Sequence, residues 1–370
     1  MGAPLRPILG YSDAIRSVIF TGRYPDEHGY WMEYCFRPEQ SPWRGLELLG
    51  VLDRLPSDLA LRALKLAGSA TAMKALARRR GYPHMDLRHI PFRGLGCFDL
   101  TLDRPMTAPG SLGVPTIFDR CMDTGRSWVY LDSSKLGRRM LLEEAARLPE
   151  DVGLIFVYLH HIDMASHVRG IESRRFWRCV RETDAFVQRV TDRVRDRFPG
   201  ISPLVFSDHG MSVLRQQIGI PELGRHPGFP SEFFFALDAT MVRLWYRNRD
   251  AGLRQELREL VDRRLPGRFL TSQDRAELHL NFTGSLYGDD IFLLPPGTAV
   301  FPNFHSYIKP KAMHAYHPDD RDQHGIFVGP STVADRVRAP MNMVDIAPLC
   351  LELMGVEASR PQENSARSGA

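Results

Sequence analysis

The clearest chemical signal in this sequence is an Asp-His pair directly after a short apolar run. Residues 202–206 have the composition of a buried strand and are followed by Ser207, Asp208, His209 and Gly210. Ligands of open α/β sheets collect at the carboxyl ends of strands. A carboxylate and an imidazole at that position can bind one divalent metal ion. We therefore expect Asp208 and His209 to be metal ligands, provided that the chain supplies the rest of a site.

A second pair of candidate ligands follows the apolar run 152–159. Asp163 and His167 are four residues apart, so one helical turn would place both on the same face. Such a pair is usually a surface ion pair when it stands alone. Because this pair lies just past a buried strand, metal binding and ion pairing are both open interpretations.

A third cluster of candidate ligands precedes another apolar run, at residues 326–328. Any single histidine of this cluster is more typical of a protein surface than of a metal site. Since several lie so close to a strand, we expect at least one of them to be a ligand: His314, His317 or His324.

Ser12 could supply a nucleophile to these groups. It begins a helix-like run and, judged locally, could be only an N-cap. Phosphoryl transfer at two metal ions, however, needs clusters of metal ligands and a nucleophile. Three clusters of Asp and His at strand ends and a hydroxyl at a helix start would supply both. A serine alkoxide at the positive end of a helix would be a competent nucleophile at neutral pH.

The elements that must position these groups alternate between strand and helix patterns from residue 127 onward. Strands are expected at 128–131, 152–159, 202–206, 241–246 and 326–328, and helices at 140–148, 174–197 and 343–354. This alternation predicts an α/β fold with a mostly parallel sheet sandwiched by helices.

One segment differs in composition from this pattern. Residues 40–125 combine a Leu/Ala/Arg-rich helical stretch at 56–80 with a Gly/Pro-rich stretch at 94–115. We interpret them as a cap inserted into a single catalytic domain that spans residues 1–356. The small, polar residues 357–370 are expected to form a disordered tail.

The overall composition is that of an ordinary globular protein of 370 residues. A net charge of +4 does not by itself indicate a nucleic-acid partner. Five scattered cysteines without CxxC spacing argue against a disulfide framework and favour a reducing compartment. No apolar run approaches the roughly 20 residues of a transmembrane helix, and residues 1–10 lack a signal-peptide core. We expect a cytoplasmic protein; its oligomeric state is not indicated.

Taken together, the motifs resemble the type I phosphodiesterase/nucleotide pyrophosphatase family of the alkaline phosphatase superfamily. In that family a nucleophilic Thr or Ser lies nine residues before a Thr-Gly pair, which is followed by Pro and then His-Gly. The matching positions here are Ser12, Thr21-Gly22, Pro25 and His28-Gly29. Residues 343–348 also resemble the closing helix of the family.

The family's metal ligands have counterparts in the same three clusters. Its Asp-x-x-x-His motif matches Asp163 and His167, and its Ser-Asp-His-Gly-Met motif matches residues 207–211. Its third histidine lies 13 residues before the Phe of a final strand, which selects His314 and leaves His324 in reserve.

This resemblance implies an alkaline phosphatase-like fold and a hydrolase of phosphodiester or pyrophosphate bonds. It implies two divalent metal ions, most simply zinc, of which one would be held by Asp163, His167 and His314 and the other by Asp208, His209 and Ser12. Ser12 would attack phosphorus and form a phosphoseryl intermediate that water then hydrolyses. The substrate would be a small molecule or a lipid- or sugar-linked phosphodiester, with no nucleic-acid partner.

The sequence departs from the family pattern at three positions. The family supplies a further Asp ligand from a first strand, but none of the eleven residues before Ser12 is Asp, so this strand looks truncated. Glu33 occupies the position of a phosphate-binding Asn, where a carboxylate would repel phosphate unless it is protonated or paired. Asp13 replaces an aromatic residue that stacks on nucleobases, which disfavours nucleotide substrates.

Two alternatives follow from these departures. A sulfatase would share the fold, and Ser12-x-Ala14-x-Arg16 approximates the motif that is converted to formylglycine. Sulfatases, however, bind one calcium ion through oxygen ligands, which does not call for three imidazoles. The second alternative is an inactive member of the family that binds a ligand without turnover because the first-strand Asp is missing.

Overall fold

The strands next to the candidate ligands form two small sheets in a computed structural model, which describes residues 2–45, 47–48, 50, 53, 90–248, 250–306 and 308–356. In one sheet, β4 (Ser127–Asp132) and β5 (Val152–Tyr158) are parallel. The other sheet has the order β16-β1-β15-β6 and consists of β16 (Met341–Asn342), β1 (Gly2–Arg6), β15 (Gly325–Val328) and β6 (Val205–Phe206). The α/β fold is therefore confirmed.

The pairing of the strands is more mixed than the expected, mostly parallel sheet. β1 is parallel to β16, but β15 runs antiparallel to both β1 and β6. β15 is reversed because it begins where β6 ends: the amide of Ser207, just past β6, donates to the carbonyl of Ile326. The chain thus enters β15 from the site end of the sheet, without a crossover helix.

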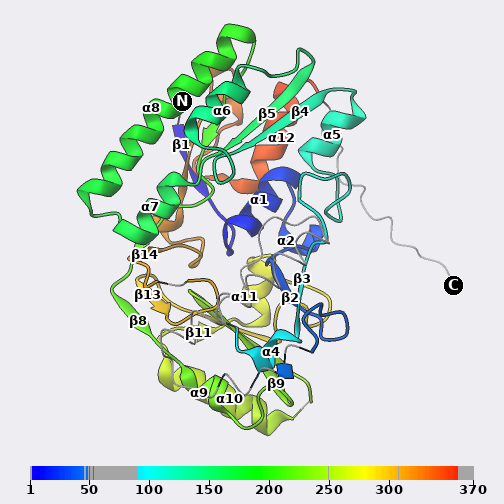
Figure 1. Cartoon of the computed structure of the whole chain (residues 1–370), viewed down its shortest axis with the longest axis vertical. Coiled ribbons are helices and arrows are strands. Elements are labelled where there is room, and N and C mark those ends of the chain that lie inside the picture. Colours follow the sequence, from blue (N-terminus) through cyan, green and yellow to red (C-terminus); the bar gives the residue numbers. More distant parts are fainter. Residues whose placement is uncertain are drawn as a thin grey trace, which may run out of the picture.

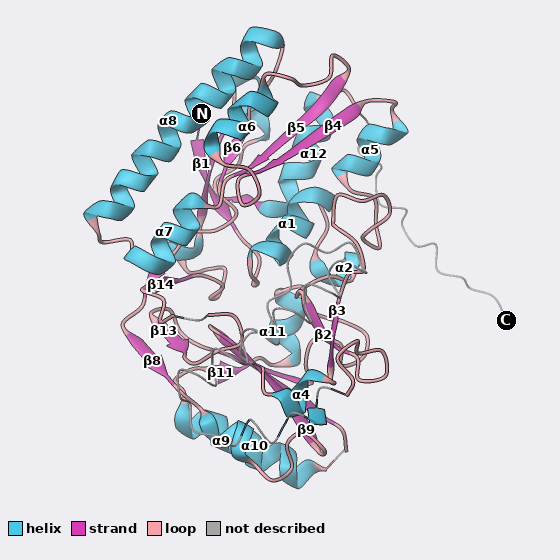
Figure 2. Cartoon of the chain, viewed as in Figure 1, coloured by secondary structure: helices cyan, strands magenta, loops and turns pink. Residues whose placement is uncertain are grey.

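Helices cover both faces of the β4–β5 pair (Figures 1 and 2). On one face, Leu154 and Phe156 pack into the core formed with α1 (Ser12–Thr21), α5 (Ile117–Asp123) and α12 (Ile346–Leu353). On the other face, Ile155 and Val157 pack against the core of α6 (Arg138–Ala145) and α8 (Arg174–Arg197). This arrangement confirms that the sheet is sandwiched by helices. The described helices include no apolar segment of the length needed to cross a membrane.

A second body lies below the first in Figure 1 and contains an antiparallel sheet. Its strand order is β11-β12-β10-β9, from β11 (Arg268–Phe269), β12 (Asp290–Leu293), β10 (Met241–Tyr246) and β9 (Phe233–Asp238). The strand expected at 241–246 is therefore present, but it belongs to this second sheet. Only Ala239 and Thr240 separate it from β9, and so short a link permits only an antiparallel hairpin.

The second body is assembled from two distant parts of the chain. β2 (Tyr34–Phe36) and β3 (Phe98–Leu100) pair beside α4 (Phe92–Leu95), and their side chains share one core with the antiparallel sheet. The remaining helices of this body are α9 (Pro221–Arg225), α10 (Ala251–Arg264) and α11 (Ser272–Glu277). The cap expected at 40–125 is thus only one contributor, and α5, inside that range, packs with the first body instead. The stretches 56–80 and 357–370 lie outside the described residues.

The hairpin between β9 and β10 joins the two bodies. The Thr240 hydroxyl donates to the carbonyl of Ala315 at 2.8 Å and contacts the Tyr11 hydroxyl at 3.0 Å. The Thr240 amide also donates to the Tyr11 hydroxyl, at 3.2 Å. Ala239, beside Thr240, is buried in a cluster with Met313 and Tyr316. The hairpin tip therefore supports the residues that precede Ser12 and follow His314.

Candidate active site

Ser12 is the first residue of α1, directly after Tyr11. The N-cap position belongs to Tyr11, so the interpretation of Ser12 as only an N-cap does not apply. Its hydroxyl instead lies 3.1 Å from Nε2 of His209. A Cβ at Gly10 would come within 2.8 Å of the Ala14 Cβ, so glycine allows the chain to enter α1 this tightly.

Asp163 lies at the centre of the candidate ligands. It sits in the first turn of α7 (His161–Arg169), which begins soon after β5. Its Oδ1 atom is 3.1 Å from His167 Nε2, 3.8 Å from His314 Nε2 and 3.9 Å from His209 Nε2. The structure thus brings together, around one carboxylate, three histidines that are far apart in the sequence.

The other ring nitrogen fixes the orientation of two of these histidines. Nδ1 of His167 lies 2.8 Å from the carbonyl of Ala312, and Nδ1 of His209 lies 2.8 Å from the carbonyl of Gly210. A carbonyl only accepts, so each Nδ1 must carry the proton and donate it. Nε2 of both rings is then the nitrogen that faces Asp163 and that could bind a metal ion once it is unprotonated, which is the arrangement of metal-bound histidines.

His314 completes the cluster from the loop after β14 (Ala312–Met313). Its ring stacks on that of His209, with ring centroids 3.6 Å apart. Burial, with a further contribution from His209, holds the pKa of His314 well below its usual value, so the ring is neutral at pH 7. Its Nδ1 atom is buried without a hydrogen-bond partner.

The two carboxylates of the cluster are half-buried, and each has one buried oxygen, Oδ1 of Asp163 and Oδ2 of Asp208. Burial alone would raise the pKa of Asp163, but the hydrogen bond and charge of His167 outweigh it and lower the pKa well below its usual range. Asp208 places Oδ2 3.6 Å from His209 Nε2, and this oxygen is buried without a hydrogen-bond partner. An unsatisfied buried carboxylate oxygen next to free imidazole nitrogens fits a divalent cation. In particular, Asp163, His209 and His314 offer ligand atoms that all lie within 4.8 Å of one another.

Gly210 allows the two ligand loops to meet. A Cβ at this position would lie 2.1 Å from the carbonyl oxygen of Asp322 and 2.6 Å from that of His324. The Gly210 amide donates to the carbonyl of Gln323 at 2.7 Å. His324 itself lies outside the cluster, since its Nε2 contacts the carbonyl of Pro318 at 3.1 Å.

Glu33 lies at the start of the second body, immediately before β2. Its carbonyl accepts a hydrogen bond from the amide of Thr101 at 2.9 Å, and the residue is half-buried. Among the described residues, the carboxylate of Glu33 is not part of the group of potential metal ligands around Asp163.

The sequence reasoning did not predict two neighbours of the candidate site. Arg16, one helical turn after Ser12, lies over the Tyr158 ring at 4.8 Å and pairs with Asp13. Its spacing of four residues from Ser12 was a usable signal. Thr240 had no such signal, because its contacts with Tyr11 and Ala315 bridge 229 and 75 positions.

The chain is similar to known proteins both in a family model of sequence and in its fold. Residues 101–276 match the family model described as type I phosphodiesterase/nucleotide pyrophosphatase. No curated protein sequence matches the chain at a significant level.

Solved structures of ectonucleotide pyrophosphatase/phosphodiesterase 5 share the fold. The human protein is 13% identical with a TM-score of 0.63, and the match covers 96% of this chain and 87% of that one. The murine protein is 12% identical with a TM-score of 0.64, and the match covers 97% of this chain and 87% of that one. An inactive variant of the murine protein in complex with AMP matches with a TM-score of 0.63, at 12% identity over 97% and 87% of the two chains.

Proposed function

We propose that this chain, which matches the family model of type I phosphodiesterase/nucleotide pyrophosphatase over residues 101–276, is a hydrolase that cleaves phosphodiester or pyrophosphate bonds with Ser12 as the nucleophile. The observation that carries the proposal is the position of the Ser12 hydroxyl. It lies at a helix start, 3.1 Å from Nε2 of His209, a histidine whose neighbours are the half-buried carboxylates of Asp163 and Asp208.

The donor set supports two divalent metal ions, most simply zinc. We assign Asp163, His167 and His314 to one ion and Asp208, His209 and Ser12 to the other. Three imidazole side chains match the preference of zinc rather than that of calcium, so the sulfatase alternative is disfavoured. Bound ions would supply Lewis-acid stabilisation of phosphoryl oxygens and favour the ionised form of a hydroxyl.

The chain's own groups orient the reaction. The N–H groups of the first turn of α1 have no partner within the helix, and such groups favour negative charge at the helix start, where Ser12 lies. Attack by the Ser12 oxygen forms a bond to phosphorus, while the bond to the leaving group breaks and that group keeps its oxygen. Water then displaces Ser12 from the phosphoseryl intermediate and regenerates the hydroxyl.

The substrate that fits these residues best is a small phosphodiester. The murine relative forms a complex with AMP, so a nucleotide is one candidate. In this chain, however, Asp13 pairs with Arg16 and offers no ring on which a base could stack. We therefore favour a sugar- or lipid-linked phosphodiester, with Glu33 facing the polar part of the substrate.

Metal-dependent turnover of bis(p-nitrophenyl) phosphate tests this function. Protein stripped with a chelator is expected to be inactive and to regain activity on titration with zinc. Ser12→Ala should lower kcat by at least a thousandfold with the fold intact, because the nucleophile is lost. Ser331→Ala, at an exposed serine distant in sequence, should match the parent. No turnover by the parent at saturating zinc would support the inactive alternative.

A further inference from the structure

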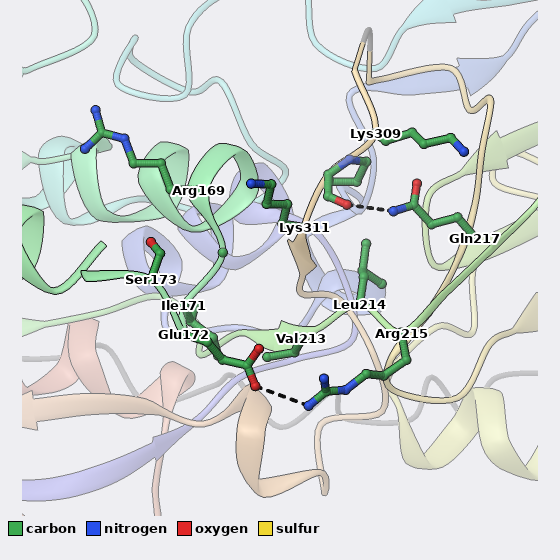
Figure 3. Close-up of a pocket in the computed structure, with 12 residues that line it drawn as sticks. Arg169, Ile171, Glu172, Ser173, Val213, Leu214, Arg215, Gln217, Lys309 and Lys311 are labelled. Carbon is green, nitrogen blue, oxygen red and sulfur yellow. Dashed lines mark hydrogen bonds and ion pairs between the residues drawn. The ribbon is translucent and has the colours of Figure 1, made fainter. Parts of the chain in front are cut away.

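A cavity of about 580 Å³, whose lining does not include Ser12, lies where the two bodies adjoin (Figure 3). Its walls come from the α7–α8 connection (169–173), from residues 213–217 after β7 (Ser212–Val213), and from residues 309–311 before β14. This size falls within the range of small-molecule sites.

The lining of this cavity is strongly basic. It contains Arg169, Arg215, Lys309 and Lys311 but only one acidic residue, Glu172. Glu172 is already paired with Arg215 at 3.2 Å, as the dashed line in Figure 3 shows. Among the described residues, the other three cationic side chains have no carboxylate partner, so they leave a net positive charge around the cavity.

The start of α8 adds to this charge. Ser173, which lines the cavity, is the N-cap of this 24-residue helix, and the first turn of α8 contains no acidic residue. The positive end of the helix dipole is therefore not compensated within the helix. The Ser173 hydroxyl accepts from the Phe176 amide at 3.1 Å, and the amides of Arg174 and Arg175 have no partner inside the helix and can reach an acceptor at this end.

The cavity shares a wall with the candidate active site. The Lys311 amide donates to the carbonyl of His167 at 2.8 Å, and the next carbonyl, that of Ala312, accepts from His167 Nδ1. Leu214 on the opposite wall donates its amide to the Lys311 carbonyl. A ligand that orders residues 309–311 would thereby also fix the orientation of His167.

We propose that this cavity binds a multiply charged phosphate-type anion, held by Arg169, Lys309, Lys311 and the start of α8. The anion is either a distal charged group of the substrate or a separate ligand that stabilises the site. A distal group of the substrate and a separate ligand would be bound by the same cationic groups, and the kinetic experiment below distinguishes them.

Calorimetric titration with inorganic pyrophosphate in the presence of a chelator tests the site without any metal or catalysis. The parent should bind, and the double variant Arg169→Gln/Lys309→Gln should bind at least tenfold more weakly. The matched control is Arg193→Gln/Arg195→Gln, which removes the same charge from exposed positions at the other end of α8 and should bind like the parent. Since Lys309 lies outside any helix or strand, the single variant Lys309→Gln should show a smaller loss of affinity in a protein that folds normally.

Kinetics of the zinc-loaded protein then identify the source of the anion. A rise in KM for ATP in the double variant, with KM for bis(p-nitrophenyl) phosphate unchanged, supports a distal group of the substrate. A change in bis(p-nitrophenyl) phosphate turnover on addition of pyrophosphate, seen in the parent but not in the double variant, supports a separate ligand.

Absence of pyrophosphate binding by the parent, or equal affinity in the parent and the double variant, would overturn the proposal. Because binding is measured without turnover, a failure of the proposed hydrolase activity would leave this result standing on its own.

Discussion

At the scale of single residues, the site combines groups that were recognisable from spacing with groups that only the fold brings near. Asp163 and His167 stand four apart on one helix, and Asp208 and His209 are adjacent, so local sequence was sufficient to select them. The proton positions on His167 and His209 were not predictable, because their carbonyl partners are defined only by the folded backbone.

His28, from the His-Gly pair that follows Pro25, carries a prediction about pH. Burial lowers its pKa to about 4, against a smaller opposing effect of its own backbone hydrogen bond. Its Nδ1 atom accepts from the Tyr30 amide at 3.2 Å, and Nε2 lies 3.2 Å from the Ser17 hydroxyl. Protonation would remove the acceptor of the Tyr30 amide, so the folded state requires the neutral ring.

The direction of the pH effect on stability follows from the protonation of His28 in the folded and the unfolded chain. Between pH 6.5 and about 4 the unfolded chain binds a proton at His28 and the folded chain does not. The free energy of unfolding should therefore fall as pH decreases through this window, by roughly 3 kcal/mol for this group. In urea unfolding, His28→Gln should be less stable than the parent at pH 7 and should lose less stability on going from pH 7 to 4.5. An equally steep loss in both proteins would contradict the assignment.

At the scale of elements, β5 and β6, which end at the site, were predictable, but β14, which ends directly before His314, was not. The partners of the strands were not predictable either. The apolar run 241–246 identified a strand correctly, and only the two-residue turn to β9 determined its antiparallel sheet. Similarly, β15 was expected at 326–328, but its reversed direction depends on the path of the loop that carries His314.

The β9–β10 hairpin provides a prediction at this scale. Thr240→Val keeps the side-chain shape but removes the hydroxyl that contacts Tyr11 and Ala315. Each lost buried hydrogen bond costs about 1–2 kcal/mol. Without these hydrogen bonds, Ser12 and His314 should be held less firmly in position. We therefore expect kcat to fall about tenfold with KM nearly unchanged.

Steady-state kinetics with zinc-loaded protein measures this change, and Thr332→Val at an exposed position is the matched control. If Thr240→Val lowers only the unfolding temperature and leaves kcat intact, the hairpin stabilises the fold without positioning the site.

At the scale of the whole molecule, two bodies meet at the site, and the sequence indicated only one of them clearly. The alternating pattern after residue 127 predicted the α/β body and its helices. The second body was predicted only in part, as a cap at 40–125, because its sheet comes mainly from residues 233–293. Composition marks an insertion but does not reveal which distant segment shares its core.

The exposed edge of β5 is a further property of the whole fold. β5 pairs with β4 on one side, and within the described part of the chain no strand pairs with its other side. All seven of its residues are half-buried although most are apolar, in contrast to the fully buried strand that its continuous apolar pattern predicts. Such an edge is open to pairing with another strand.

The central claim is that Ser12 forms a covalent bond to phosphorus during turnover. Acid-quenched, zinc-loaded protein mixed with bis(p-nitrophenyl) phosphate can be digested and its peptides mapped by mass spectrometry. We predict a transient phosphoryl adduct on the peptide that contains Ser12, formed and lost at rates consistent with kcat. Turnover without an adduct at Ser12 at any quench time, or an adduct on another residue, would contradict the account.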